Sequence, residues 1–359
     1  MSTDLVSKNN TTTDITDVVW LQTSFIGDIV ITTAAFAALH KCLPNVKQHL
    51  ITTPIGKAAL EGHPLLASIH VFDKRQGGLG AMFRLRREIK SLKLNSAIIL
   101  QPHKSLRSTL LSQIIGLPFI TYTETNASWL ATKRVPRVSV MHEADRIALL
   151  LEGLGLDRKE FLGSKPNLPQ TNLPISASAL GQKRQWIGIA PGSVWATKRW
   201  PTPKFATLTQ LLLDRPDTGV VLLGSKDEIP AAQFIEDAAI RTRPGARDRV
   251  INLVGKTTLA DLNGIYPRLS IVITNDSSPI HYASAFNIPT VAIFGATVPA
   301  MGFGPLATGS KIAEIDLPCR PCGAHGGATC PLGHFKCMND LSVEAVLDQI
   351  AKAGSSLPK

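Results

Sequence analysis

Short apolar runs alternate with segments of helical period along most of the chain, and this alternation constrains the fold more than any other feature. Apolar runs of this length predict buried strands, and apolar residues recurring every three or four positions predict amphipathic helices. Strands that alternate with helices form parallel, doubly wound sheets. The chain is therefore predicted to be an α/β protein.

Two such series follow each other along the chain. In the first half, strands are expected at residues 18–22, 48–52, 69–72, 97–100 and 120–122, and helices at 29–39, 81–92, 105–115 and 142–154. In the second half, strands are expected at 187–190, 220–223, 250–253, 271–274 and 290–294, and a last amphipathic helix at 342–353. No sequence repeat relates the halves. They predict two Rossmann-like domains that face each other across a cleft.

Length and composition agree with two domains. A chain of 359 residues with 44% hydrophobic residues can bury two cores of common size. Pro166, Pro169 and Pro174 lie in a polar stretch between the halves, which predicts a linker. The predicted organisation is a disordered tail over residues 1–17, a first domain over 18–165, the linker over 166–180, a second domain over 181–340, and a helix and tail over 341–359.

The charge balance predicts an anionic partner. The formal net charge is +11, which suits a nucleic acid, an acidic membrane surface or a phosphorylated small molecule. Three Tyr and five Trp without basic residues interleaved among them disfavour nucleic acid. No secretory signal precedes the first domain, and no apolar stretch reaches the roughly 18 residues of a membrane helix. We therefore expect a cytoplasmic protein, soluble or peripheral to a membrane.

The loop over residues 191–201 follows a predicted strand and precedes a predicted helix. Ser193 offers a hydroxyl, and Lys198 and Arg199 offer positive charge beside the N–H groups of the helix start. This combination predicts a phosphate-binding turn. An ordinary loop with solvated basic residues explains the turn alone equally well.

Two further turns of the second domain carry polar side chains after a strand. Asp276, Ser277, Ser278 and His281 are predicted to hold sugar hydroxyls and a diphosphate, with a helix cap followed by Pro as the alternative. Glu228 is expected either to bind ribose hydroxyls or to lie in the first turn of a helix, where negative charge is favourable.

In the first domain, Asp28 follows the first strand and Gly27. Capping of the following helix is the simplest interpretation, and a general base at the mouth of the cleft is the functional one. Lys104 and Arg107 follow a later strand and are predicted to grip an anionic acceptor. Residues 84–93 carry five basic side chains among apolar ones, which favours a solvated helix face over one that docks on anionic lipid.

Four of the five cysteines lie close together near the end of the chain. Cys319 and Cys322 have metal-ligand spacing, but Cys330 and Cys337 do not complete a ribbon or finger pattern. Reduced thiols that pack in a loop are therefore favoured over a structural metal, and no metal is expected.

Taken together and in this order, the motifs resemble those of the lipopolysaccharide heptosyltransferases of glycosyltransferase family nine, particularly the heptosyltransferase II branch. The resemblance spans residue 18 to the C-terminus and rests on four segments, which are Gly27-Asp28, residues 191–201, Asn275 to His281, and Cys319 to His334. The chain departs from the family at Ser278, where Gly is usual, and at residues 296–299, which leaves the adenine end of the donor site less certain.

The resemblance implies a GT-B fold and transfer of heptose from ADP-L-glycero-D-manno-heptose to the inner core of lipopolysaccharide, with inversion and no cofactor. The first domain is then the acceptor side and the second the donor domain. Asp28 matches the family's proposed base, Lys198 its pyrophosphate-binding lysine, and Ser193 a phosphate-contacting hydroxyl. Glu228 matches the ribose-side carboxylate and Asp276 the acid that holds the donor sugar. Such an enzyme is expected at the cytoplasmic face of the inner membrane.

Two other functions stay open from the sequence. The first is a GT-B transferase or epimerase that uses another nucleotide sugar. The second is a nucleotide-sugar-binding module without catalysis, which the presence of both Asp28 and Lys198 argues against.

Overall fold

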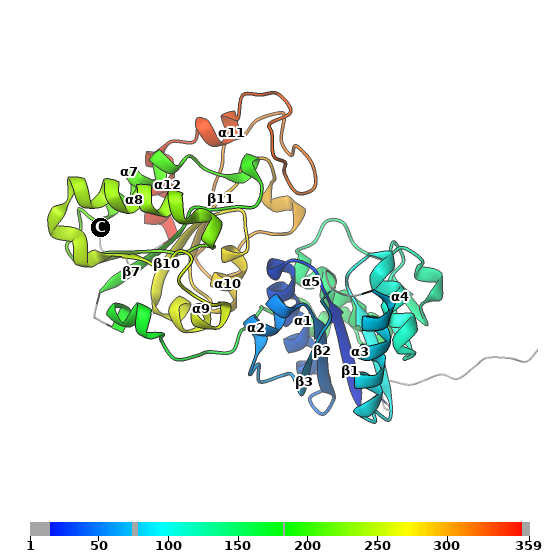
Figure 1. The fold of residues 1–359 in the computed structure, drawn as a ribbon. Helices are drawn as coiled ribbons and strands as arrows, with labels where there is room; N and C mark the ends of the chain where they lie inside the picture. Colours follow the sequence, from blue (N-terminus) through cyan, green and yellow to red (C-terminus); the bar gives the residue numbers. More distant parts are fainter. Residues whose placement is uncertain (1–14, 74–77, 182–183, 354–359) are drawn as a thin grey trace, which may run out of the picture. The chain divides into compact units, whose positions relative to one another are not determined.

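The computed structural model describes residues 15–73, 78–181 and 184–353, which form two α/β units (Figure 1). Among the described residues, the first unit comprises residues 15–57, 62–73, 78–138 and 144–164. The second comprises residues 58–61, 139–143, 165–181 and 184–353. Two short segments of the first half of the chain therefore pack with the second unit.

The first unit is built on one parallel sheet of six strands in the order β3-β2-β1-β4-β5-β6. The strands are β1 (Asp17–Gln22), β2 (Lys47–Thr52), β3 (Ser68–Val71), β4 (Ala97–Gln101), β5 (Phe119–Tyr122) and β6 (Lys133–Val135). In the centre of the sheet, Val19 pairs with His49 of β2 on one side and Ile99 of β4 on the other. Because all strands run in one direction, their carboxyl ends share one edge of the sheet.

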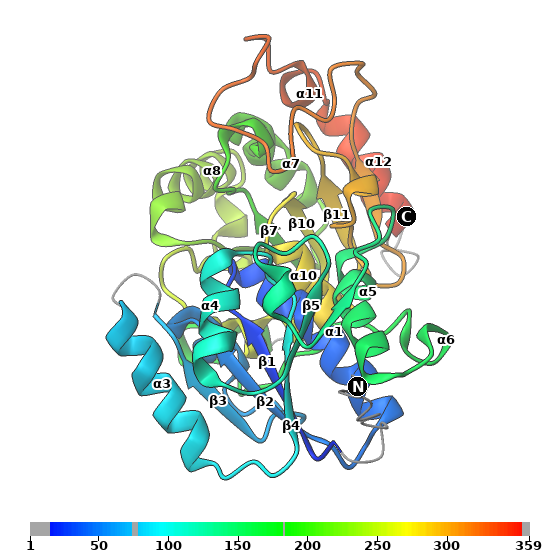
Figure 2. The same cartoon turned by 90° about the vertical axis from the view of Figure 1, so that its right-hand side faces the viewer.

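Helices cover both faces of this sheet. They are α1 (Ile26–Cys42), α2 (Pro54–Leu60), α3 (Leu79–Ser91), α4 (Leu106–Ile115), α5 (Glu143–Ala148) and α6 (Arg158–Phe161). Leu85 and Ile89 of α3 and Leu111 of α4 join one core cluster with Leu21 and Ile99 of the strands. Helices α3 and α4 therefore form one layer, and Figure 2 shows them next to each other over the strands.

The second unit repeats this topology. Its sheet has the order β12-β11-β10-β7-β8-β9, again with all strands parallel. The strands are β7 (Gln185–Ala190), β8 (Thr218–Leu222), β9 (Val250–Asn252), β10 (Leu269–Asn275), β11 (Thr290–Ile293) and β12 (Lys311–Ala313). The helices are α7 (Thr202–Leu212), α8 (Ile229–Thr242), α9 (Leu259–Ile265), α10 (Pro279–Ala285), α11 (Lys336–Asn339) and α12 (Val343–Ala353). The last helix buries Val346 and Ile350 in the core.

Short 3₁₀ helices link these elements. They are η2 (Ser128–Leu130), η3 (Leu149–Leu154), η4 (Ile175–Gly181), η5 (Ala196–Lys198), η6 (Lys226–Glu228), η7 (Pro244–Arg249), η8 (Tyr266–Arg268) and η9 (Pro299–Met301). The helix expected over residues 142–154 is divided into α5 and η3, and Gly155 ends it in the left-handed region at φ 91°. Part of the stretch expected as a linker is helical, since η4 lies at its end.

The prediction of two doubly wound parallel sheets is confirmed. Edge strands β6 and β12 and helix α2 were not expected, because each is short and has no extended apolar run. Asp17, placed at the end of the tail by sequence, is the first residue of β1, and residues 1–14 lie outside the described ranges. Among the described residues, no helix is both long and apolar enough to cross a membrane.

Candidate active site

Four βα turns meet at one edge of the second sheet. They follow β7, β8, β10 and β11, and these four strands are neighbours in the sheet, in the order β11-β10-β7-β8. Since the strands are parallel, the turns after their carboxyl ends lie together, which is where ligands bind in doubly wound sheets. The turns predicted to hold a nucleotide sugar are therefore brought to one place.

Asn275, the last residue of β10, ties two of these turns together. Its side-chain amide donates to the carbonyl of Pro191 at 2.7 Å, and its amide oxygen accepts from the backbone N–H of Trp200 at 3.1 Å. Asn275 is completely buried. The turn after β7 is therefore held at both of its ends by a side chain from β10, a role that the sequence did not indicate.

Lys198 and Asp276 form an ion pair at the centre of the turns. The ammonium nitrogen lies 2.7 Å from Oδ2 of Asp276, and both side chains are largely buried. Thr297, from the turn after β11, donates its hydroxyl to the same carboxylate oxygen at 2.5 Å. The carboxylate thus fixes the position of the lysine. Thr297 lies in the segment 296–299, where the chain departs from the family's usual sequence.

Arg199 is hydrogen-bonded to the backbone of Ser193. The Arg199 Nε donates to the carbonyl of Ser193 at 2.7 Å, and one terminal nitrogen donates to the carbonyl of Val194 at 3.4 Å. Ser193 is buried. Two of the arginine's donors therefore hold the shape of the turn, while its positive charge still lies beside the Lys198 site.

Glu228 fills the space between two glycines. Its Oε2 accepts from the backbone N–H of Ser225 at 2.6 Å, in a capping box at the start of η6. A Cβ atom at Gly192 would lie 1.3 Å from Oε1 of Glu228, and one at Gly224 would lie 2.4 Å from Oε2. Glu228 thus lies in the first turn of η6, as one of the two expectations had it, and its side chain also lies against the turn after β7.

Ser277 and Ser278 begin the turn into α10. The Ser277 hydroxyl donates to the carbonyl of Gly192 at 3.4 Å. Ser278 has φ −52° and ψ −30°, which is ordinary helical geometry. Serine at this position therefore needs no glycine-like conformation.

His281 is buried in the first turn of α10. Burial foremost, and then the charges of His142 and Lys198, lower the pKa of His281 to about 3. The edge of its ring approaches Phe303, with the ring centroids 6.3 Å apart. His281 is therefore a neutral imidazole at physiological pH.

The cysteine-rich loop packs against the turn that carries Lys198. Thr197 donates its hydroxyl to the carbonyl of Gly327 at 3.0 Å and accepts from the Gly327 N–H at 2.8 Å. Arg320 donates to the carbonyl of Thr297 at 2.9 Å, and the Cys322 N–H donates to the carbonyl of Ala296 at 2.8 Å. The loop thus supports two turns of the site.

The thiols of Cys319, Cys322, Cys330 and Cys337 are free, and Cys337 is buried. Burial raises the pKa of the Cys322 and Cys337 thiols, whereas backbone N–H donors, that of Phe335 foremost, lower the pKa of Cys330. Within the described ranges, no three His, Cys, Asp or Glu side chains are arranged to hold a metal ion. That no metal is required stays a prediction.

Asp28 lies in the first turn of α1, at the carboxyl edge of the first sheet. The N-cap position is Phe25, whose side chain makes no capping hydrogen bond, and Asp28 follows three residues later. Its backbone carbonyl accepts from the hydroxyl of Thr32 at 2.7 Å. The side chain is half-buried. Asp28 is therefore not the N-cap residue, although its charge is favourable in this turn.

A cavity of about 370 Å³ opens in the first unit beside the start of α4. Its lining residues are Thr23, Phe72, His103, Ser105, Leu106, Arg107, Ser108 and Leu111. Of the two predicted acceptor residues, Arg107 lines the cavity and Lys104 does not.

Helix α4 aims its N-terminus at this cavity. The Ser105 hydroxyl accepts from the N–H of Ser108 at 3.2 Å as the helix cap, and Nδ1 of His103 lies 3.0 Å from the same hydroxyl. Arginine, imidazole, hydroxyls and a helix N-terminus together suit an anionic group. His103 and Ser105 were missed in the sequence, although both directly follow β4.

Comparison with known proteins relates the chain to one family. The model of glycosyltransferase family 9 (heptosyltransferase) matches residues 82–332. The lipooligosaccharide heptosyltransferase 2 of Campylobacter jejuni is 25% identical over 335 residues, which cover 92% of this chain and 96% of that protein.

Two solved structures share the fold. A glycosyl transferase family 9 protein from Veillonella parvula has a TM-score of 0.78 at 20% identity, and the match covers 94% of this chain and 97% of that one. The ADP-heptose lipopolysaccharide heptosyltransferase II of Escherichia coli has a TM-score of 0.74 at 20% identity, covering 94% of this chain and 98% of that one.

Proposed function

Because the chain belongs to glycosyltransferase family 9, the heptosyltransferases, we propose that it transfers heptose from ADP-L-glycero-D-manno-heptose to the inner core of lipopolysaccharide. The names of its relatives support this substrate pair, since they include a lipooligosaccharide heptosyltransferase 2 and an ADP-heptose lipopolysaccharide heptosyltransferase. The observation that carries the proposal is the buried Lys198–Asp276 pair where the turns of the second sheet meet.

The second unit is proposed to bind the donor. The Lys198 ammonium and the backbone N–H groups after β7 and β10 would hold the diphosphate, with Ser193, Arg199, Ser277 and Ser278 around it. Asp276 would hold the heptose and Glu228 the ribose, because carboxylates accept hydrogen bonds from sugar hydroxyls. His281, held neutral, would add an uncharged partner beneath the sugar.

The reaction is proposed to be a single displacement with inversion. The acceptor hydroxyl attacks the anomeric carbon, the bond from that carbon to the diphosphate breaks, and ADP leaves with the electron pair. The hydroxyl proton passes to the Asp28 carboxylate, which acts as general base. Lys198 stabilises the charge that develops on the leaving diphosphate. These residues complete the step without a cofactor.

The cavity beside α4 is proposed to take an anionic group of the inner core. Arg107, His103 and the capped helix start provide the charge and the donors that a carboxylate or phosphate needs. Lys104 is proposed to act outside this cavity, on a more distant part of the acceptor. The enzyme would work at the cytoplasmic face of the inner membrane, where such a lipid-linked acceptor is exposed.

Heptose transfer is tested by incubating the purified protein with ADP-heptose and a heptose-deficient core. We expect release of ADP, a product heavier by one heptose, and an inverted anomeric centre by NMR. Asp28→Asn should lower kcat by at least about 10²-fold with little change in donor affinity. The control is Asp157→Asn, since an asparagine there can still cap α6 through the N–H of Lys159.

The same assay separates the two alternatives. Turnover of another nucleotide sugar in place of ADP-heptose would replace the proposed donor while keeping the transferase. Tight ADP-heptose binding with no product, unaffected by Asp28→Asn, would instead indicate a binding module. Arg107→Gln should raise the acceptor KM and leave the donor KM unchanged, and an equal effect on both would remove the proposed role of the cavity.

A further inference from the structure

Positive charge is concentrated in one segment of the first unit. Residues 79–137 contain ten Lys and Arg against two Glu, a net +8 of the chain's +11. Both glutamates have partners, since Glu88 lies 2.5 Å from Nδ1 of His70 and Glu124 accepts from the backbone N–H of Arg137. Five of these ten basic residues lie on or just after α3, and the segment also includes α4 and η2.

The same segment exposes large apolar side chains. Leu79 and Phe83 lie four residues apart on α3, Leu106 and Leu110 lie four residues apart on α4, and Trp129 follows on η2. Residues four apart in a helix share a face. The exposed fraction is 74% for Trp129 and 52% for Phe83. The described residues thus show apolar side chains on three neighbouring elements in a strongly basic background.

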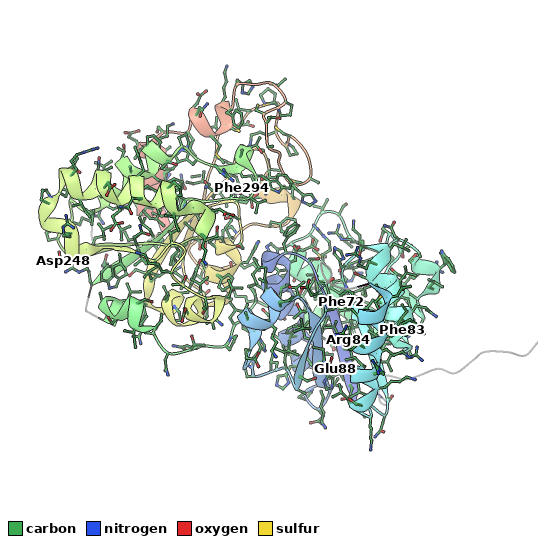
Figure 3. The ribbon with its side chains drawn as sticks, in the orientation of Figure 1. Phe72, Phe83, Arg84, Glu88, Asp248 and Phe294 are labelled. Carbon is green, nitrogen blue, oxygen red and sulfur yellow. The ribbon has the colours of Figure 1, made fainter. Side chains whose placement is uncertain are left out.

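These elements lie side by side in one layer. The Arg86 guanidinium of α3 donates to the carbonyl of Ile114 of α4, and the Thr109 hydroxyl of α4 donates to the carbonyl of Asn126, just before η2. Met82, Leu85 and Leu111 face the sheet, so the exposed side chains of α3 and α4 point away from it. Figure 3 shows where Phe83, Arg84 and Glu88 lie along α3.

We propose that this layer docks on an anionic lipid surface through a docking face made of Leu79, Phe83, Arg84, Arg87, Leu110 and Trp129. Trp, Phe and Leu are the side chains that enter the headgroup and acyl boundary, and arginines around them are attracted by anionic headgroups. A nucleic acid would attract the arginines but would offer no apolar phase for Leu79 or Leu110. The combination therefore favours lipid.

The place of the docking face relative to the cavity supports this partner. Leu106 and Arg107 line the cavity and belong to the first turn of α4, and Leu110 lies one turn further along the same helix. A lipid-linked acceptor bound in the cavity would therefore extend from a membrane next to the docking face. The inference rests on the proposed function only in taking the acceptor to be lipid-linked.

Flotation of the full chain with vesicles tests the docking face. Vesicles of equal parts phosphatidylglycerol and phosphatidylcholine should bind the protein, and phosphatidylcholine vesicles should bind it at least about tenfold more weakly. Phe83→Ser should weaken binding to the anionic vesicles about fivefold or more. Phe234→Ser is the matched control, because Phe234 is 48% exposed on α8 of the second unit, and it should bind like the parent.

Arginine variants test the charge in the same way. Arg84→Gln with Arg87→Gln should weaken binding to the anionic vesicles by about tenfold or more. Arg241→Gln with Arg247→Gln, both exposed on the second unit, should leave it within about twofold.

Tryptophan fluorescence locates the contact. Trp20, Trp186 and Trp200 are buried, so Trp129 and Trp195 are the tryptophans of the described chain that vesicles can reach. A blue shift on adding anionic vesicles should vanish in Trp129→Phe and persist in Trp195→Phe. Equal behaviour of Phe83→Ser and Phe234→Ser, a shift that persists in Trp129→Phe, or equal binding to both vesicle types would overturn the proposal. The proposal would also fail if a single-stranded oligonucleotide displaced the protein from anionic vesicles while Phe83→Ser still bound them like the parent. That result would indicate a surface for polyanions in general.

An activity assay separates this proposal from heptose transfer itself. Phe83→Ser should keep the parent's kcat on a short, water-soluble acceptor and lose rate only on acceptor embedded in vesicles. If the parent transfers no heptose to either acceptor, the proposed function fails while vesicle binding is still decided by flotation. If the variant loses rate equally on both acceptors, the docking face is wrong.

Discussion

The ammonium of Lys198 lies 2.7 Å from the Asp276 carboxylate, and the two side chains expose only 12% and 6% of their surface. Leaving one member of such a buried pair without the other costs about 3 to 5 kcal/mol. The pair is therefore a fixed part of the second unit. Under the proposed function, a cation held in place in this way does not have to reorganise to bind a diphosphate.

Variants of Lys198 and Asp276 should show that this ion pair contributes separately to the free energy of unfolding and to ADP affinity. Lys198→Met leaves the Asp276 carboxylate buried without its cation, so the free energy of unfolding should fall by about 3 kcal/mol and ADP affinity by at least about 10²-fold. Adding Asp276→Asn should recover most of the stability and none of the ADP affinity. Urea unfolding and calorimetry measure the two quantities. Lys256→Gln, an exposed lysine of the same unit, is the control.

Gly192 should tolerate alanine only when Glu228 is shortened. A Cβ at Gly192 would lie 1.3 Å from Oε1 of Glu228, so Gly192→Ala must displace that side chain and its bond to Ser225. We expect a loss of about 1 to 3 kcal/mol, which Glu228→Ala should relieve in the double variant. Gly245→Ala, with open space around its Cβ, should be neutral. Additive losses in the double variant would contradict this packing.

Stability should fall between pH 6.5 and pH 3 because of His281. Its pKa is about 3 in the folded protein, below the ordinary 6.5, so in this window the unfolded chain binds a proton that the folded chain does not. At pH 4 this contribution amounts to about 3 kcal/mol. His281→Gln removes it, so the variant should lose less stability than the parent between pH 7 and pH 4. The exposed His325→Gln control should lose stability with falling pH in parallel with the parent. If His281→Gln also ran parallel to the parent, the lowered pKa of His281 would be wrong.

The cysteines of the last loop should alkylate in a fixed order. Backbone N–H donors lower the pKa of the Cys330 thiol, and burial raises that of Cys337, so iodoacetamide at pH 7.5 should label Cys330 first and Cys337 last. Peptide mass mapping over time gives the order. In urea the two rates should become equal, and a difference that survived unfolding would show that the fold is not its cause.

The alternation of apolar runs and helical segments was sufficient to predict both sheets. Buried strands such as β7 and β10 carry continuous apolar side chains, and βαβ connections leave one common arrangement for them. The edge strands β6 and β12 pair on one side only and carry Lys133, Arg134 and Lys311. With three residues each, they have too few positions for any period to show.

The sequence was enough to predict which turns form the candidate site. It was only partly enough to predict which side chains contact each other there. Position after a strand was enough to single out Lys198 and Asp276. Their link to Thr297 depends on which strands are neighbours, and Arg199 turning onto its own loop depends on side-chain direction. Neither is visible in the spacing of residues. Arg107 lines the cavity and Lys104 does not for a similar reason, because α4 begins between them at Leu106.

Thr197 and Gly327 join segments that are 130 positions apart in the chain. The short turn that carries Lys198 is consequently held by a residue that belongs to no strand or helix of the second unit. If the proposed function is correct, rebuilding the loop around Gly327, for example to exchange its thiols, would change the affinity for the nucleotide without altering a residue proposed to contact it. To change the donor that this chain accepts, we would therefore begin with the loop residues that bind Thr197.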